Sequence, residues 1–245
     1  KPITMQVTGN NLPQPHKSIR LFMDGLSFFQ DDSWKRIDFT TNDTQLNHAL
    51  ATCLCHPFFA ENTRSTLQVQ VNLPYTTLIP SHLLSKQESL DVVRFLFPET
   101  ESNKDYVVFN QPLQSFDITL LFALPIAYYN LIKQIADQIH WTHETAEQLE
   151  HSLKLSKKNG QQHVWMVANN THIHLSVAKN GELLFANHFQ VSSQEDILYY
   201  CAQTYEQHGL SQQDTPLYIE GNPDLQTLLQ KYIVNCHIAD YHANH

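Results

Sequence analysis

The sequence contains little glycine, with six glycines in 245 residues. None of them lies in a G-x-G-x-x-G or G-x-x-x-x-G-K-S/T pattern, in which small residues let backbone N–H groups approach a phosphate. These two common phosphate-binding loops are therefore excluded. Cysteine is also scarce. Because four cysteines are too few for a disulfide framework, we expect reduced thiols in a cytoplasmic protein.

Basic residues are few and are not concentrated anywhere in the chain. Lys and Arg total 15 against 24 Asp and Glu, which gives a formal net charge of -9. Proteins that bind nucleic acid use a basic surface to contact its phosphates, so we expect no nucleic acid partner. No apolar run approaches the ~20 residues needed to cross a bilayer, so we also expect no membrane insertion. Hydrophobic residues still make up 42% of the chain, which is enough for one large or two small cores.

The first half alternates between strand and helix patterns after a polar start. Residues 1–15 are polar and include Pro13 and Pro15, so we expect a flexible N-terminal arm. Apolar and polar residues then alternate as in a half-buried strand, and Asp24-Gly25 is typical of a hairpin turn. The predicted elements are strands over 18–23, 26–29 and 34–39, a helix over 45–55 and a strand over 67–73.

The middle of the chain is richer in helix patterns. Pro125 is suited to the first turn of a helix, and apolar residues at helical spacing continue to Ile139. After the predicted helix over 143–155, the sequence from Lys157 to Gly160 contains two lysines and a glycine, which are typical of the end of a helix. We therefore place a domain boundary there, between residues 16–158 and 159–245. The predicted elements are a helix over 85–97, antiparallel strands over 106–111 and 118–124, and helices over 125–139 and 143–155.

The second half repeats the order of the first. Asn180-Gly181 predicts a tight hairpin between two strands. Three antiparallel strands, a helix, a strand, a helix and a strand thus occur twice. We therefore predict a mixed α/β fold with two ribonuclease H-like units. The predicted elements of the second half are strands over 163–167, 173–178 and 183–189, a helix over 194–208, a strand over 217–219, a helix over 223–232 and a strand over 235–240.

The helix over 194–208 has the clearest signals. Ser192 or Ser193 is suited to cap it, with Glu195 placed to complete a capping box, and Gly209 is suited to end it. The residues that we expect to face the sheet are Leu198, Cys201 and Tyr205, and those that we expect to face water are Glu195, Gln203 and Glu206.

Two segments resemble the actin-like superfamily, in which two ribonuclease H-like units form an ATPase. Residues 105–138 are similar to the strand pair and helix between the halves of actin-like pilus assembly and type II secretion proteins; they read DYVVFNQPLQSFDITLLFALPIAYYNLIKQIADQ. Residues 164–189 resemble the hairpin that opens their second half, and read VWMVANNTHIHLSVAKNGELLFANHF. Residues 171–209, with their Asp-Ile-Leu-Tyr-Tyr and Glu-Gln-His-Gly-Leu motifs, also resemble an uncharacterised bacterial family of unknown function. Together the resemblance covers residues 16–245.

The resemblance implies a nucleotide site made by two glycine-bearing hairpins, one in each unit, with an acidic residue for Mg²⁺. Asn169 and Asn170 stand where the second hairpin is expected to have an acid and a glycine. We therefore expect a vestigial ligand-binding cleft, no ATP hydrolysis, no metal and no cofactor. The residues left at these positions are Asp24, Gly25, Asn169, Asn170, Thr171 and Gly221.

Two cysteine and histidine groups are weak metal candidates. Cys53, Cys55 and His56 offer soft ligands, but neighbouring positions of a helix point apart and no second cluster completes a tetrahedral site. We expect core cysteines there. The tail has no recognised metal spacing; its candidate ligands are Cys236, His237, His242 and His245.

Other enzyme classes lack their motifs. A Ser-His-Asp triad has no G-x-S-x-G elbow to nominate its nucleophile. A ribonuclease H-type nuclease needs acids on its first helix and fourth strand, and residues 45–55 and 67–73 contain none. His172 and His174 alternate with apolar residues, so we expect them on the wetter face of one strand.

We therefore predict a non-catalytic actin-like protein that acts as an interaction or scaffold module with another protein as its partner. The alternative is a nucleotide-binding ATPase or kinase-like enzyme that uses a cleft between the two units. Its binding residues would include Asp24, Gly25, Thr171 and Gly221. An ordinary hairpin turn is the simpler explanation for the pair Asp24-Gly25, because these residue types are common in such turns.

Overall fold

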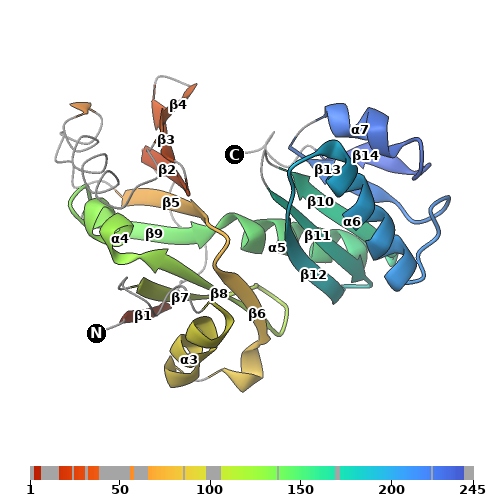
Figure 1. The fold of residues 1–245 in the computed structure, drawn as a ribbon. Helices are drawn as coiled ribbons and strands as arrows, with labels where there is room; N and C mark the ends of the chain where they lie inside the picture. Colours follow the sequence, from red (N-terminus) through yellow and green to blue (C-terminus); the bar gives the residue numbers. More distant parts are fainter. Residues whose placement is uncertain are drawn as a thin grey trace. The chain divides into compact units, whose positions relative to one another are not determined.

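The computed structural model describes most of the chain, and Figure 1 shows its course. The chain divides into two compact units, residues 1–147 and 148–245, each of which is described by itself. The residues described are 3–6, 17–23, 25–30, 33–38, 56–57, 66–84, 86–97, 106–136, 138–168, 172–221 and 223–239. The predicted helix over 45–55 lies outside them.

The first unit contains a five-stranded sheet with the order β4-β3-β2-β5-β9. Neighbours β2, β3 and β4 are antiparallel, whereas β2, β5 and β9 run parallel. Alternation of apolar and polar residues produces this sheet, because Leu67, Val69 and Val71 are buried while the residues between them are half-buried. The strands are β2 (Lys17–Phe22), β3 (Gly25–Gln30), β4 (Ser33–Asp38), β5 (Thr66–Asn72) and β9 (Gln138–His143).

A second sheet in the first unit has the order β1-β7-β8-β6. Phe109 stacks on Phe122 in its centre, with 4.8 Å between ring centroids. Helix α3 (Lys86–Leu96) covers it with buried Val93 and, beside that residue, Leu90 and Phe97. The strands are β1 (Ile3–Gln6), β6 (Thr76–Pro80), β7 (Tyr106–Pro112) and β8 (Ile118–Pro125), and a 3-10 turn, η1 (Ser81–Leu83), follows β6.

Two predictions for the first unit are wrong. Residues 3–6 are not part of a loose arm, because β1 pairs in parallel with β7 and gains ladder hydrogen bonds. The helix that begins after Pro125 does not continue to Ile139, since α4 (Ile126–Lys133) ends early and β9 follows. Ile139 instead lies opposite Leu67 of β5, so pairing within the sheet outweighs the helical spacing.

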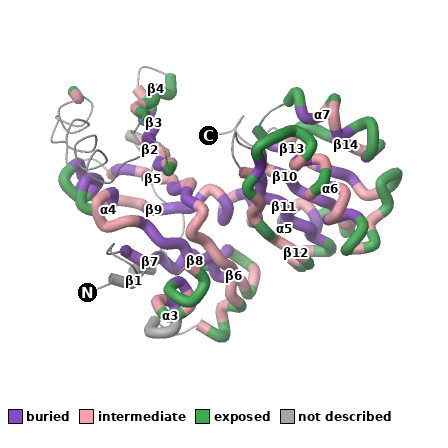
Figure 2. The backbone as a smooth tube through the Cα atoms, in the orientation of Figure 1, coloured by how far each residue is buried: buried purple, intermediate pink, exposed green. Residues whose placement is uncertain are grey.

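The second unit has a five-stranded sheet with the order β12-β11-β10-β13-β14, which matches the first sheet in strand order and direction. Figure 2 shows β10 and β11 mostly buried at its centre. Helix α5 (Glu144–Asn159) enters the unit, so the chain divides within α5, whereas the predicted boundary lies at its end. The other elements are β10 (His163–Ala168), β11 (His172–Lys179), β12 (Glu182–Gln190), α6 (Gln194–Gln207), β13 (Leu217–Glu220), α7 (Asp224–Leu229) and β14 (Cys236–Ile238).

Helix α6 begins with a capping box in which Ser193 is the N-cap. Its partner is Asp196, not the predicted Glu195, because Asp196 occupies the third helical position and accepts from the Ser193 N–H group. Gly209 follows the helix with φ of 60°, as predicted. The predicted hairpin turn is confirmed too, since Asn180 and Gly181 have φ of 51° and 81°.

The buried face of α6 differs slightly from the predicted stripe. Cys201 and Tyr205 are buried as predicted, but Leu198 is half-buried and Ile197 lies deeper in the core. Gln203, expected to face water, is half-buried. In the described part of the chain, no helix is both long enough and apolar enough to cross a membrane.

Candidate functional site

The carboxyl ends of the parallel strands are the part of each sheet where ligands usually bind in α/β folds. In the first unit these ends are Phe22 of β2, Asn72 of β5 and His143 of β9. Phe22 lies opposite Asn72, and His143 lies opposite the preceding residue of β5, Val71. In the second unit they are Ala168 of β10, Glu220 of β13 and Ile238 of β14. Gly25 and Gly221, the two predicted ligand-binding residues that the structure describes, lie next to these ends.

Gly25, in the first predicted hairpin, is buried where β2 turns into β3. A Cβ atom at this position would overlap the backbone oxygen of Ile37 on β4. The absence of a side chain is therefore explained by the close approach of β4. Asp24 lies outside the described residues.

Gly221 follows β13 and has φ of 108°, which favours glycine. A Cβ atom there would also overlap the backbone oxygen of Ala168 at the end of β10. The structure thus brings Gly221 to the residue that precedes the predicted hairpin. The three hairpin residues, Asn169, Asn170 and Thr171, lie outside the described residues.

A pair of acidic residues lies at the carboxyl end of the first sheet. Glu147 accepts a hydrogen bond from Gln70 Nε2, with 2.8 Å between the atoms, and Glu144 accepts one from Asn72 Nδ2. Both carboxylates come from the first turn of α5, where the helix dipole favours negative charge. Such oriented carboxylates are suited to hold Mg²⁺ through water or to orient a water molecule.

His143 fixes the start of α5. The N–H group of Thr145 donates to its Nδ1 atom, at 3.2 Å, and its Nε2 atom lies 3.1 Å from the backbone oxygen of Leu73. Nδ1 therefore accepts, and Nε2 carries the proton that it donates. The side chain of Gln111 accepts a further bond from the His143 N–H group, so this buried histidine is fully used in positioning the helix.

At the carboxyl end of the second sheet, Glu220 is buried beside Trp165. The ring of His151 from α5 lies 5.1 Å from the Trp165 ring. Burial lowers the pKa of His151, the carboxylate of Glu220 opposes that shift, and Lys154 adds to it. This arrangement places an acid, Glu220, directly before Gly221 in the chain, and an imidazole, His151, against the ring of Trp165.

A serine and a histidine are hydrogen-bonded in the core of the second unit. Ser152 Oγ lies 2.8 Å from His163 Nε2, and both residues are fully buried. Burial, helped by the charge of His151, lowers the pKa of His163 to about 4. Among the residues that the structure describes, none hydrogen-bonds to the Nδ1 atom of His163, so no described acidic group orients the ring. The pair lacks both the access and the third member that a catalytic triad needs.

The metal candidates do not come together in the described part of the chain, which contains no cluster that fits a metal ion. His56 contacts the Phe28 ring at 4.9 Å, while Cys53 and Cys55 lie outside the described residues. Cys236 is buried in the core, and His237 bonds to Asn235. His242 and His245 also lie outside the described residues.

The two histidines of β11 do not share a wet face. His174 is buried, because its ring packs at 4.4 Å against His188 of the neighbouring strand, and His172 is half-buried. The expectation of a wetter face is therefore wrong for His174. Close cross-strand packing of the two rings gives the reason.

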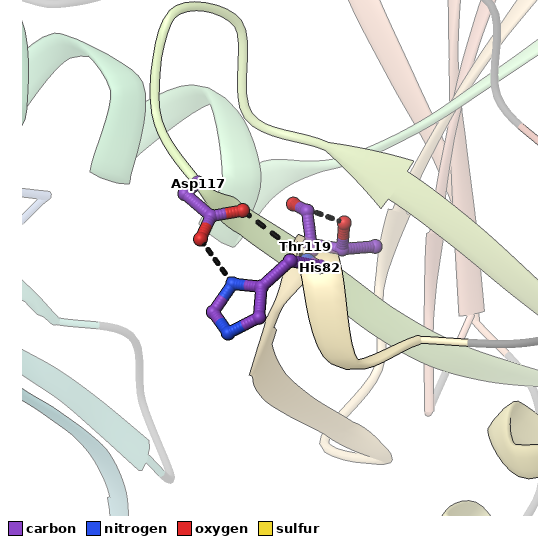
Figure 3. A network of polar contacts seen from close by, with 4 residues as sticks. His82, Asp117 and Thr119 are labelled. Atoms are coloured by element: carbon purple, nitrogen blue, oxygen red, sulfur yellow. Dashed lines mark hydrogen bonds and ion pairs between the residues drawn. The ribbon is translucent and has the colours of Figure 1, made fainter.

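A third polar group lies on the other sheet of the first unit. Figure 3 shows the ring of His82 bonded to the carboxylate of Asp117. Next to them, the hydroxyl groups of Ser81 and Thr119 are hydrogen-bonded, with 2.8 Å between the oxygen atoms. The side chains of His82 and Asp117 are 65% and 60% exposed. They hold η1 to the turn before β8, and an exposed pair of this kind contributes little to stability.

Sequence reasoning missed the acids that the structure places at the sheet ends. Glu144 and Glu147 lie in a segment with a helix pattern. The only sequence signal for their role is their spacing of three residues, which puts both acids on one side of the first helical turn. Gln70 and Asn72 alternate along one face of β5, which is a usable signal for their common direction. Glu220 gives no signal, because its burial depends on Trp165 in another strand.

Comparisons with known proteins agree with this architecture. A family model described as a protein of unknown function, DUF3822, matches residues 10–236. No curated protein matches the sequence. A Bacteroides thetaiotaomicron protein with an actin-like ATPase fold and unknown function has a TM-score of 0.76 at 18% identity, over 91% of this chain and 90% of that one. The PilM-PilN type IV pilus biogenesis complex gives a TM-score of 0.56 at 10% identity, over 91% of this chain and 87% of that one.

These likenesses show the fold. The predicted mixed α/β, actin-like fold is confirmed, as is the resemblance to a bacterial family of unknown function. The fold prediction depended on the order of elements along the chain, and the structure adds that both five-stranded sheets have the strand order 3-2-1-4-5, counted within each sheet.

Proposed function

The chain belongs to the DUF3822 family, and from the contacts at its sheet ends we propose that it is a cytoplasmic protein-interaction or scaffold module that does not hydrolyse ATP. The buried free thiols of Cys201 and Cys236 agree with a reducing compartment. The PilM-PilN structure is a complex of two proteins, which gives a precedent for this fold in protein binding.

The proposal rests on the surroundings of Gly25 and Gly221, where neighbouring backbone fills the space that a side chain would need. Gly25 is buried against Ile37, and the Cβ side of Gly221 is filled by Ala168. A phosphate-binding glycine must leave its backbone N–H group open to the ligand. Here the fold alone accounts for both glycines, so neither of them requires a nucleotide.

The predicted second hairpin supports the same conclusion on chemical grounds. Asn169 and Asn170 carry amides where the resemblance implies an acid and a glycine. An amide contributes no negative charge toward Mg²⁺ and cannot act as a base toward the attacking water. Without these groups, the γ-phosphate of a bound nucleotide lacks the charge stabilisation that phosphoryl transfer needs.

One observation favours the alternative of a nucleotide-binding ATPase or kinase-like enzyme. Asn72 and Gln70 orient the carboxylates of Glu144 and Glu147 at the carboxyl end of the first sheet. Carboxylates in this place are suited to bind hydrated Mg²⁺. The two functions therefore make opposite predictions for phosphate release.

The deciding experiment measures Mg²⁺-dependent phosphate release by the purified chain. We expect no release above that of the Asp24→Ala and Glu144→Gln variants. Release that both substitutions abolish would establish the enzyme alternative. Thermal unfolding with MgATP adds a binding readout, because ligand at 100 times its Kd should stabilise the fold by about 2.7 kcal/mol.

The interaction role needs a separate test. Proteins that co-purify with the native chain would be identified and purified. Their affinities for the wild type and for the Asp24→Ala variant would then be measured. Equal affinities would support a binding surface outside the sheet ends. A partner that binds only with MgATP present would count against the proposal.

A further inference from the structure

Helix α6 carries an exposed tyrosine that the fold does not account for. In its Asp-Ile-Leu-Tyr-Tyr motif, Asp196 completes the capping box and Ile197 is buried in the core, so both residues have structural roles. Tyr199 of the same motif is 59% exposed. A single exposed apolar side chain needs no explanation, but one that continues a larger apolar surface is a feature of interaction sites.

Tyr199 begins a row of five rings on the second unit, which we call the aromatic row. Its ring centroid lies 5.3 Å from that of Tyr200, which in turn stacks at 4.3 Å on Phe189 of β12. The centroid of Phe185 lies 6.5 Å from that of Phe189 and 4.9 Å from that of His208. The last four rings are half-buried, so the row is partly open to solvent. It joins the Asp-Ile-Leu-Tyr-Tyr and Glu-Gln-His-Gly-Leu motifs in one surface.

Two acidic side chains lie on the same side of α6 as Tyr199. Glu195 precedes Tyr199 by four residues and Glu206 follows it by seven, so the three residues line one side of the helix. Both glutamates are exposed. Of the ion pairs in the described part of the chain, none involves either glutamate. The open end of the aromatic row therefore lies between two carboxylates that are available to a partner.

The sequence around these carboxylates supplies no cation. Residues 180–230 contain seven Asp or Glu and no Lys or Arg. They include both α6 and α7, which pack on the same core cluster and so cover the same face of the sheet (Figure 1). A surface of this charge repels nucleic acid and anionic lipid, and it attracts cations. Charge complementarity therefore selects a basic partner.

We propose that the side of α6 formed by Glu195, Tyr199 and Glu206 binds an arginine-containing segment of a partner protein. A guanidinium group stacks on an aromatic ring and at the same time donates hydrogen bonds to a carboxylate. Tyr199 and Glu195, one helical turn apart, offer both contacts to one arginine. Lysine has a compact, strongly hydrated charge and lacks the planar surface that stacks on a ring. The inference rests on the proposed interaction role, to which it adds a surface and a class of partner.

The first test measures the binding of a short fluorescent peptide to the full chain by anisotropy. In the probe, arginine alternates with glycine, and two reference peptides have lysine or glutamine in place of arginine. We expect saturable binding of the arginine peptide, about threefold weaker binding of the lysine peptide and no binding of the glutamine peptide. Affinity for the arginine peptide should fall as salt screens the charges. Equal binding of the arginine and lysine peptides would overturn the proposal.

Variants of Tyr199 locate the binding surface. Tyr199→Ala should weaken binding of the arginine peptide by about threefold or more, because the stacking ring is lost, whereas Tyr199→Phe keeps the ring and should bind like the wild type. Because Tyr199 is exposed, neither change disturbs the core. Tyr232→Ala is the matched control, since Tyr232 is 51% exposed but is not part of the aromatic row. If Tyr199→Ala binds as well as Tyr232→Ala does, the proposal is rejected.

A charge reversal on α6 tests the carboxylates. Glu206 lies near the end of α6, where the helix dipole favours a cation, so Glu206→Lys should fold normally. It should weaken binding of the arginine peptide by about threefold or more at low salt. Asp91→Lys is the matched control, because it makes the same change in net charge at an exposed position of α3 in the first unit. Equal losses in the two variants would show an effect of net charge alone and would contradict the proposal.

Sedimentation of the chain by itself tests a second copy as the occupant. Each chain carries a formal net charge of -9, so we expect no self-association that depends on Tyr199. A dimer that Tyr199→Ala weakens would assign this surface to a second copy and reject the partner segment. These results are distinguishable from those for the proposed function, because co-purifying partners and phosphate release are measured without the peptide.

Discussion

Trp165 donates a hydrogen bond from its indole Nε1 atom to Oε2 of Glu220, with 3.4 Å between the atoms. Both residues are 2% exposed, although they belong to different strands. A buried carboxyl group is costly unless donors satisfy it. This bond therefore fixes the acid at the end of β13 and ties it to the core.

Replacing Trp165 by Phe should lower the free energy of unfolding by roughly 2 kcal/mol, because Glu220 loses a donor. Urea unfolding measures the change. Trp34→Phe is the matched control, since Trp34 is 41% exposed on an edge strand, and its effect should be much smaller. Equal losses would show that the indole N–H group does not stabilise Glu220.

Gly221→Ala should destabilise the second unit by roughly 3 kcal/mol, because a Cβ atom would overlap Ala168 and because φ of 108° is strained for alanine. Gly160→Ala is the control. Gly160 also has a positive φ, of 67°, but has open space where its Cβ would lie. Its cost should be only about 1 kcal/mol. Calorimetric unfolding of both variants would compare them, and similar losses would mean that the Ala168 contact is not the cause.

Ile197→Ala should cost roughly 2–5 kcal/mol, because it leaves a cavity between α6 and the sheet. Glu206 lies on the exposed side of the same helix, so Glu206→Ala should change stability by less than about 0.5 kcal/mol. Chemical unfolding distinguishes these outcomes. A small effect of Ile197→Ala would show that α6 presents another face to the core.

Stability should fall as the pH drops from about 6.5 to about 4. His163 is neutral in the folded protein, where burial lowers its pKa from an ordinary value of 6.5 to about 4. The unfolded chain binds the proton more readily in this range, so acid favours unfolding, by up to roughly 3 kcal/mol for this residue. His163→Gln should flatten the dependence of the urea midpoint on pH. Ser152→Ala should lower stability at each pH but should not change the dependence of the urea midpoint on pH, because the imidazole of His163 remains.

The second unit was predictable from sequence because its signals are local. Asn180-Gly181 specifies a hairpin by its own backbone preferences, and the capped helix that ends near Gly209 has the spacing of one buried face. Here each local preference agrees with the tertiary structure.

The first unit was less predictable because distant pairing decides it. Ile139 has helical spacing after Pro125, yet its pairing with Leu67 makes it part of a strand. β1 and β6 are short, and their sheet partners are far away in the sequence. The site had the same difficulty, since the burial of Glu220 and the orientation of Glu147 depend on Trp165 and Gln70 in other elements.

The pairing of β1 with β7 has a consequence for synthesis on the ribosome. Ile3 lies opposite Val107, so β1 leaves the ribosome about one hundred residues before its partner strand is made. Until then its backbone groups are open to water or to chaperones. The second unit, by contrast, finds all partners of its sheet within residues 163–238. Translational pausing between β1 and β7 should therefore lower the yield of folded chain more than pausing within the second unit does.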